Sequence, residues 1–268
     1  MKKFFISLSL CLLCGHTLWA ADAWNRWSSL AKLEAAAYNN NPTAMSDLGR
    51  YYFATEQYAQ ALPWLERAAG KNSSEGLFML GYCYETGLCG KDINTKKAVG
   101  YYKRAAAKKN PNALYRLGRM MLTGKAGKVN AKKGVQYLEK AAEKHSWDAQ
   151  NFLAEAYCSG QVAGIEQDYK EAQKAWQKLS DGGDLQARYH LAELYEQGKG
   201  AAMDLHRAFE LYASAATEGY APAAYKTALA YLEGRGVEMD TGKGLQWLET
   251  AAAQNYAPAQ EKLKSRAN

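Results

Sequence analysis

The sequence ARYHLAELYEQGKGAAMDLHRAFELYASAATEG, from Ala187 to Gly219, reads as a helix, a glycine-rich loop and a second helix. Small and apolar residues recur at helical spacing in its first part, and Gly198 and Gly200 then interrupt the pattern. Glycine ends helices readily because it adopts left-handed backbone conformations without steric cost. Asp204 follows, and an Asp side chain accepts hydrogen bonds from the free N–H groups of a first helical turn. The stretch therefore predicts a helix pair joined by a short loop.

The same pattern recurs along most of the chain. A small residue, followed four positions later by Leu or Thr and then by Gly or Ala, recurs at intervals of 32 to 38 residues. A second marker, Ala-Ala or its equivalent at the close of each unit, has the same period. A fixed period of this length indicates a repeat array in which each helix pair packs on the next. The opening positions are Ala44, Gly76, Ala113, Ala149, Ala187 and Ala223, and the predicted caps are Asn94, Asn130, Asp168, Asp204 and Asp240.

These repeats resemble two related families. Residues 42–71 lack the long glycine loop and resemble a tetratricopeptide repeat, with Leu48-Gly49, Tyr51, Ala61, Leu65 and Ala68 on that motif's spacing. Residues 72–255 resemble five SEL-one-like repeats, most closely from Ala223 to Ala252, where Gly234-Arg235-Gly236-Val237 precedes Asp240. The resemblance implies an all-α fold, a right-handed α-solenoid of stacked antiparallel helix pairs that forms a superhelix.

The two segments that flank the repeats are predicted to cap the solenoid. Residues 21–41 carry Trp24, Trp27, Leu30, Leu33 and Ala37 on one face of a continuous helix. Residues 256–268 begin another helix and become polar. We expect both to cover apolar faces that an open solenoid would otherwise expose.

Residues 1–20 have the pattern of a secretory signal peptide. Lys2 and Lys3 precede an apolar run that ends near Cys14, and small residues follow at Ala20 and Ala21. The run is shorter than the roughly 20 residues that span a bilayer. We therefore expect a periplasmic or secreted protein, with no membrane insertion of the mature chain.

Composition and motifs argue against several other classes of protein. The net charge is +7, and we interpret it as spread over alternating acidic and basic residues. We therefore expect no nucleic-acid partner. Ser29 and Lys32 match the SxxK pattern of penicillin-binding enzymes, but no KTG or SDN motif accompanies it. We expect no catalytic residue, no cofactor and no metal site. The His residues after the signal segment lack metal-ligand spacing and are interpreted as solvated surface; they are His145, His190 and His206.

Three Cys residues remain after the signal segment, namely Cys83, Cys89 and Cys158. An odd number excludes complete pairing within one chain. Cys83 and Cys89 are close in sequence, and in an oxidising compartment they could form a local disulfide. Three unpaired thiols are the alternative.

The family resemblance implies a partner protein bound in the concave groove by side chains of the first helices. We expect a monomeric scaffold; the alternatives are a periplasmic immunity protein that neutralises a toxin and, least favoured, a penicillin-binding or β-lactamase-like enzyme. Packing on the neighbouring helix is the competing role for each aromatic residue. The tetratricopeptide register places these residues in the groove: Arg50, Phe78, Tyr82, Tyr115, Arg119, Glu155, Tyr189, Glu193, Glu196 and Tyr225.

Overall fold

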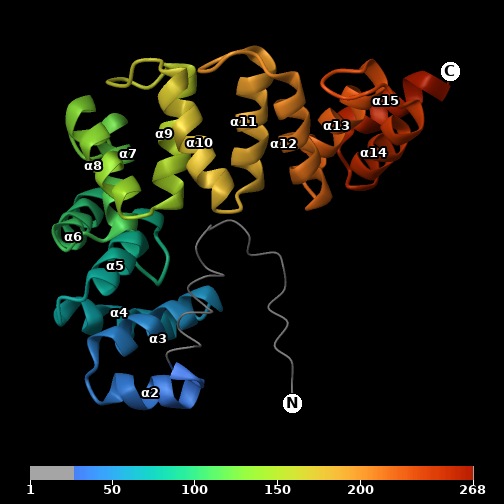
Figure 1. Ribbon diagram of the computed structural model, residues 1–268. Helices are drawn as coiled ribbons and strands as arrows, with labels where there is room; N and C mark the ends of the chain where they lie inside the picture. Colours follow the sequence, from blue (N-terminus) through green and yellow to red (C-terminus); the bar gives the residue numbers. More distant parts are fainter. Residues whose placement is uncertain (1–26, 268) are drawn as a thin grey trace. The chain divides into compact units, whose positions relative to one another are not determined.

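The computed structural model describes residues 27–267, and its regular structure over that range is α-helical (Figure 1). Most helices are 12 or 13 residues long, and the all-α prediction is confirmed. The helices are α2 (Leu30–Tyr38), α3 (Pro42–Ala54), α4 (Tyr58–Gly70), α5 (Ser74–Thr86), α6 (Thr95–Ala107), α7 (Pro111–Leu122), α8 (Ala131–Glu143), α9 (Trp147–Ser159), α10 (Tyr169–Asp181), α11 (Leu185–Gln197), α12 (Leu205–Thr217), α13 (Ala221–Glu233), α14 (Thr241–Ala253) and α15 (Ala257–Ala267).

The helices group into two compact units, residues 1–149 and residues 150–268. In unit 1 each helix from α2 to α8 contacts the next, and α3 also contacts α5, the first helix of the following repeat. In unit 2 the same chain of contacts runs from α10 to α15. Each unit is thus a stack of helix pairs, as expected for a solenoid.

Helix ends follow the predicted capping residues. Each predicted cap residue of a second helix accepts, with its side chain, a hydrogen bond from a backbone N–H of the first helical turn. These residues are Asn94, Asn130, Asp168, Asp204 and Asp240. Gly87, Gly198 and Gly234 end α5, α11 and α13 in the left-handed conformation. The predicted boundaries of the second helices are therefore confirmed.

The core lies between the first and second helix of each repeat. Leu65, Tyr102, Leu138 and Leu248 occupy the same repeat position in second helices, and all four are fully buried. Three of them pack directly against a glycine in the first helix of the same repeat: Leu65 on Gly49, Tyr102 on Gly81 and Leu138 on Gly118. A Cβ added to Gly49 would lie 2.5 Å from the Leu65 Cδ2 atom, so a larger residue there would force the Leu65 side chain to shift.

The segment before the first repeat differs from the predicted continuous helix. Ser28 has φ +54°, and Ser29 caps a helix that begins only at Leu30. Trp24 lies outside the described residues. Trp27 still packs beside α3, because its Nε1 donates a hydrogen bond to Asp47 Oδ2 at 2.8 Å. Residues 21–26 of the predicted capping helix lie outside the described residues, and in the described part the helix covers only Leu30–Tyr38, after a break at Ser28.

The two ends of the described chain nevertheless pack on their neighbouring repeats. Leu33 and Ala37 of α2 are buried in a cluster with Ala44, Met45 and Leu48 of α3. At the other end, Ala259 of α15 is buried and Leu263 is partly buried in the core cluster of unit 2.

Within residues 27–267, no helix has the length and apolar character needed to cross a bilayer. The predicted signal segment, residues 1–20, lies outside the described residues.

Candidate partner-binding surface

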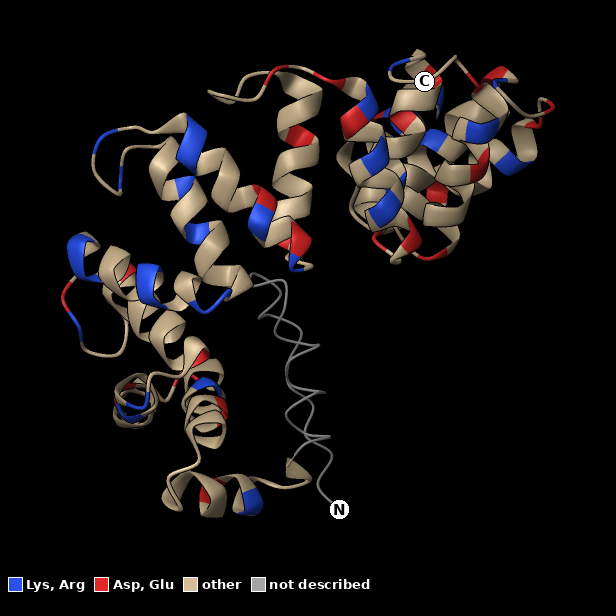
Figure 2. Ribbon diagram, turned by 60° about the vertical axis from the view of Figure 1, so that its left-hand side comes forward, with Lys and Arg blue, Asp and Glu red and all other residues tan. Residues whose placement is uncertain are grey.

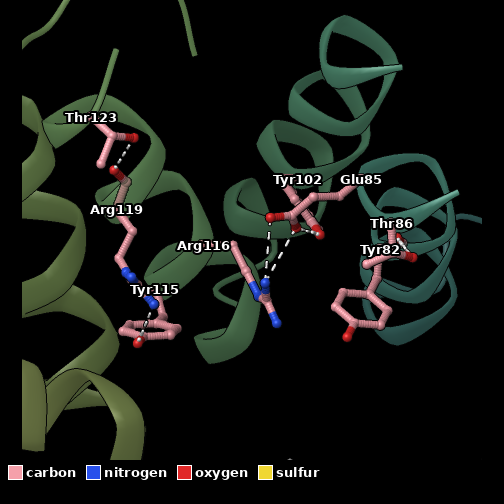
Figure 3. Close-up of polar contacts among 8 residues, drawn as sticks. All are labelled: Tyr82, Glu85, Thr86, Tyr102, Tyr115, Arg116, Arg119 and Thr123. Atoms are coloured by element: carbon pink, nitrogen blue, oxygen red, sulfur yellow. Dashed lines mark hydrogen bonds and ion pairs between the residues drawn. The ribbon is translucent and has the colours of Figure 1, made fainter. Parts of the chain in front are cut away.

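Helices α5 and α7 bring three of the predicted binding residues close together. Arg119 Nη1 donates a hydrogen bond to the Tyr115 hydroxyl at 3.3 Å, one turn earlier on α7. Arg116 extends from α7 toward α5, with its guanidinium carbon 4.8 Å from the centre of the Tyr82 ring. Figure 3 shows Tyr82, Arg116 and Tyr115 as a row. We call Tyr82, Tyr115, Arg116 and Arg119 the tyrosine–arginine row.

Glu85, at the end of α5, joins this row to the second helix of its repeat. The buried Tyr102 of α6 donates its hydroxyl hydrogen to Glu85 Oε2 at 2.5 Å. Arg116 Nη1 lies 3.3 Å from Glu85 Oε1 (Figure 3). Burial and the neighbouring Glu85 carboxylate raise the pKa of Tyr102, so its hydroxyl stays protonated as the donor. The carboxylate therefore connects α5, α6 and α7, which belong to two successive repeats.

The same arrangement occurs in unit 2 around Glu196, at the end of α11. Tyr212 of α12 donates to Glu196 Oε2 at 2.9 Å, and Lys226 Nζ of α13 lies 2.9 Å from the same oxygen. Arg235 adds an ion pair to Oε1 at 3.0 Å. Burial raises the pKa of Glu196, but hydrogen bonds from Lys226 and Tyr212 outweigh it, and the net shift is downward.

Two positions of the repeat vary together along the chain. One is the position of Glu85 and Glu196 in the first helix, and the other is the position of Tyr102 and Tyr212 in the second helix. Where the first helix ends in Glu, the second helix presents Tyr; where it ends in an apolar residue, the second helix presents Leu. This matching follows from the cost of burying a polar group without a hydrogen bond. The pairs are Glu85 with Tyr102, Glu196 with Tyr212, Phe53 with Leu65, Leu122 with Leu138, and Leu232 with Leu248, while the remaining repeat has Cys158 with Trp176.

Two predicted binding residues are therefore engaged mainly inside the fold. Glu196 has a side chain only 14 % exposed. Arg50 of α3 is equally buried and forms an ion pair with Glu75 of α5 at 2.7 Å. This ion pair of Arg50 links the first helices of two repeats.

The predicted aromatic residues are half-buried and contact one another across helices. Phe78 lies 5.8 Å from Tyr102, measured between ring centres, and 6.4 Å from Tyr82. In unit 2, Tyr189 contacts Tyr212 at 5.4 Å and Tyr220 at 5.7 Å. Burial, together with Glu193, raises the pKa of Tyr189. Tyr225 lies 5.5 Å from Tyr256, so each of these rings combines packing with an exposed edge.

Glu193 and Glu155 differ in their surroundings. Glu193 Oε2 lies 3.0 Å from Nδ1 of His190, whose ring stacks on Trp176 at 4.9 Å. The interpretation of His190 as solvated surface is therefore wrong, because its half-buried ring packs on Trp176 of α10. Glu155 on α9 is exposed, as is Arg119 in unit 1.

The candidate disulfide residues lie together in an apolar cluster. Cys83 on α5 and Cys89 in the following loop are both buried, and their Sγ atoms are 2.7 Å apart. Their mutual hydrogen bond and burial raise the pKa of Cys83, and the same hydrogen bond lowers the pKa of Cys89. Cys89 is thus the better placed of the two to ionise and attack an oxidant.

Ser29 and Lys32 do not form a catalytic pair. Ser29 Oγ accepts a hydrogen bond from the backbone N–H of Lys32 at 3.3 Å and so acts as a helix cap. Lys32 Nζ instead contacts Ser28 Oγ at 3.1 Å. Among residues 27–267, no group of three or more His, Cys, Asp or Glu side chains is arranged to hold a metal ion.

Sequence reasoning missed a strongly basic segment. Residues 91–133 contain thirteen Lys and Arg residues but a single acidic residue, Asp92. Counting charge over the whole chain hid this block, because residues 150–268 have 16 acidic and 12 basic residues. A charge count per repeat would have revealed it. Glu85 and Arg116 were missed because their roles depend on contacts between neighbouring repeats.

Comparison with known proteins agrees with the repeat architecture. The Sel1 repeat model matches residues 42–73, 74–110, 111–146, 147–184, 185–220 and 221–256. The first match covers the segment whose motif spacing resembles a tetratricopeptide repeat.

Two solved structures have a similar fold. One is a protective antigen present in uropathogenic Escherichia coli strains, with an SLR fold. It is 28 % identical in sequence with a TM-score of 0.77, and the match covers 88 % of this chain and 50 % of that chain. The other is a Sel1 repeat protein from Oxalobacter formigenes. It is 29 % identical in sequence with a TM-score of 0.71, and the match covers 82 % of this chain and 89 % of that chain.

Among curated proteins, mouse DAP3-binding cell death enhancer 1 is 34 % identical over 174 residues, which cover 63 % of this chain. The match spans only 32 % of that relative's length. The six repeat matches and these neighbours place the chain in the Sel1 repeat family, whose members generally act in protein–protein interaction.

Proposed function

We infer that this protein is an exported, non-catalytic scaffold that binds a partner protein with side chains on the first helices of its repeats. The tyrosine–arginine row on α5 and α7 is the observation that carries this inference. Tyr and Arg are enriched among the residues that dominate interface energies. Arg119 is exposed beside Tyr115, and the contacts of Arg116 hold the Tyr82 ring in place. A partner would thus meet side chains that are already ordered.

The family and the N-terminal sequence support this proposal. Sel1 repeat proteins generally bind other proteins, and the mouse relative is named for binding DAP3. The basic and then apolar pattern of residues 1–20 supports export. The neighbour described as a protective antigen is consistent with exposure of such repeats outside the cytoplasm.

The test is capture of a partner from a periplasmic extract by purified protein, read out by mass spectrometry. Tyr115→Ala with Arg119→Glu should weaken capture by at least about tenfold, since truncating interface hot spots typically costs 2 kcal/mol or more. Arg50→Glu is unsuitable, because it would place a second carboxylate against Glu75 inside the fold.

The matched control is Tyr137→Ala with Lys140→Glu on α8, a second helix. That variant should capture the partner as the unaltered protein does. Equal capture by the Tyr115/Arg119 variant would contradict the proposal. A captured toxin whose activity is blocked would identify the scaffold as an immunity protein.

A further inference from the structure

Two successive repeats of unit 1 share a short pattern where the second helix begins. Ile93-Asn94-Thr95-Lys96-Lys97 leads into α6, and Val129-Asn130-Ala131-Lys132-Lys133 leads into α8. In each case the Asn side chain caps the helix, accepting from the N–H of Lys97 at 2.9 Å and of Lys133 at 3.0 Å. The preceding apolar residue ends the loop beside a left-handed glycine, Gly87 or Gly124, and is nevertheless exposed: Ile93 is 69 % and Val129 60 % exposed.

These two apolar residues lie within the basic segment, residues 91–133. Lys96, Lys97, Lys132 and Lys133 are exposed, and within residues 27–267 none of them forms an ion pair with a carboxylate. By contrast, Lys91 and Arg116 of the same segment are paired with Glu66 and Glu85. Figure 2 shows the loops before α6 and α8 on the same edge of unit 1, with basic residues in the loops and at the helix starts behind them.

Basic residues also stand at the matching helix starts of unit 2, namely Lys170, Arg207 and Lys243. A helix N-terminus carries a partial positive charge, so lysines in the first turn are unfavourable there. The corresponding caps in unit 2 are acidic, namely Asp168, Asp204 and Asp240. The N-terminal ends of α6 and α8 therefore each combine a neutral cap residue, the positive end of the helix and two lysines.

Unit 2 offers an internal comparison for the exposed apolar residues. Met203 and Met239 occupy the position of Ile93 and Val129 and are 65 % and 66 % exposed. Basic residues near them are neutralised, because Arg207 pairs with Glu210 at 2.9 Å and Lys243 with Asp240 at 3.3 Å. Exposed apolar residues occur at this position in both units, whereas within residues 27–267 those of unit 1 lie beside lysines that have no carboxylate partner. One of these lysines, Lys97, lies over the Tyr84 ring at 5.1 Å.

We propose that this edge of unit 1, defined by Ile93, Lys96, Lys97, Val129, Lys132 and Lys133, docks on the surface of an anionic phospholipid bilayer. The lysines contact lipid phosphates, and the two apolar side chains enter the boundary between headgroups and acyl chains. Peripheral binding of this kind combines buried apolar area with attraction to anionic lipids. The surface is separate from the tyrosine–arginine row and needs no membrane-spanning helix.

The side-chain chemistry favours a bilayer over other polyanions. A nucleic acid or an acidic protein would use the lysines, but it would gain little from two aliphatic side chains held in solvent beside them. Fixed recognition of individual phosphates favours Arg, whose planar group binds in a bidentate manner, whereas Lys acts as a point charge. Lysines around exposed aliphatic side chains match an interface that presents negative charge and hydrocarbon together.

The test is co-sedimentation of the full chain with phospholipid vesicles. We expect binding to vesicles of phosphatidylglycerol and phosphatidylcholine in about a 1:2 ratio, weakening as salt increases, and little binding to phosphatidylcholine alone. Each Lys near an anionic leaflet strengthens binding about fivefold. Changing Lys96, Lys97, Lys132 and Lys133 to Glu should weaken it at least about 100-fold.

Loss of folding does not account for that result, because Glu in a first turn favours the helix. The matched control changes Lys170, Lys178, Lys264 and Arg266 to Glu, which alters the net charge equally in unit 2. This control should retain most of the binding.

Ile93→Asp with Val129→Asp separates lipid from other polyanions. This variant should lose vesicle binding at least tenfold, since each buried methylene contributes to membrane affinity, roughly fourfold per CH₂. Met203→Asp with Met239→Asp should bind vesicles as the unaltered protein does. Unchanged vesicle binding by the Ile93/Val129 variant, or tighter binding of the unaltered chain to duplex DNA or polyglutamate than to the vesicles, would overturn the proposal.

Discussion

At the scale of single residues, half-buried carboxylates join neighbouring repeats. Glu85 and Glu196 each accept a hydrogen bond from a tyrosine hydroxyl of the second helix of their own repeat. Each also accepts one from a basic side chain of the next repeat. Charge-assisted hydrogen bonds of this kind are stronger than neutral ones. Some charged residues of the first helices therefore hold neighbouring repeats together.

Glu196 should make the stability of unit 2 depend on pH. Its pKa is lower in the folded protein than the ordinary value of 4.5. Such a carboxyl stabilises the fold above its unfolded pKa, and this contribution is lost as the pH falls through the lower folded value. Glu196→Gln should lower the free energy of unfolding by about 1–3 kcal/mol at neutral pH.

Thermal unfolding at neutral pH and at about pH 3 measures this dependence. The deficit of Glu196→Gln should shrink as the pH falls, because protonation removes the stabilising charge from the unaltered side chain. Glu249→Gln, at an exposed position of α14, is the control and should change little at either pH. An equal deficit at both pH values would contradict the assigned role of the Glu196 charge.

At the scale of elements, the helix ends could be predicted from the sequence because their causes are local. Asn and Asp caps and left-handed glycines act within a few residues, so Asn94 or Gly198 can be recognised without a structure. The break at Ser28 and the engagement of Arg50 could not be predicted in the same way. Each depends on a contact with another helix, such as Trp27 with Asp47 or Arg50 with Glu75.

The loop between α5 and α6 should be fastened by a disulfide in an oxidising compartment. Cys83 and Cys89 need little movement to pair, because their sulfur atoms already lie 2.7 Å apart. A thiolate of Cys89 would attack oxidised glutathione and release glutathione thiolate, and the Cys83 sulfur would then displace the second glutathione. The bond closes a short loop, so we expect it to stabilise unit 1 by about 2 kcal/mol.

Intact mass and thiol counting test this prediction. After oxidation, protein that starts at residue 21 should lose two hydrogen atoms and keep one reactive thiol, Cys158. Reduction should lower the melting temperature of the unaltered protein and of Cys158→Ser, but not that of Cys83→Ser. Three reactive thiols after oxidation would contradict the pairing.

At the scale of the whole molecule, charge is distributed unevenly along a chain whose fold repeats regularly. Residues 1–149 contain 22 basic and 11 acidic residues, and residues 150–268 contain 12 basic and 16 acidic residues. The repeat pattern dictates buried positions such as Leu65 and Leu248 in both units, and exposed positions are free to differ. The two units therefore differ in charge at the positions that the repeat leaves open.

Contacts between successive helices should keep a local defect local. Leu65 in unit 1 and Leu248 in unit 2 occupy the same repeat position and are both fully buried. Replacing either with Ala should cost about 2–5 kcal/mol. Because solenoid repeats contact only their neighbours, Leu65→Ala should accelerate amide hydrogen exchange in α3 to α6 and leave α12 to α15 protected. Leu248→Ala should give the reverse pattern by mass spectrometry, whereas equal loss of protection throughout the chain would show a single cooperative fold.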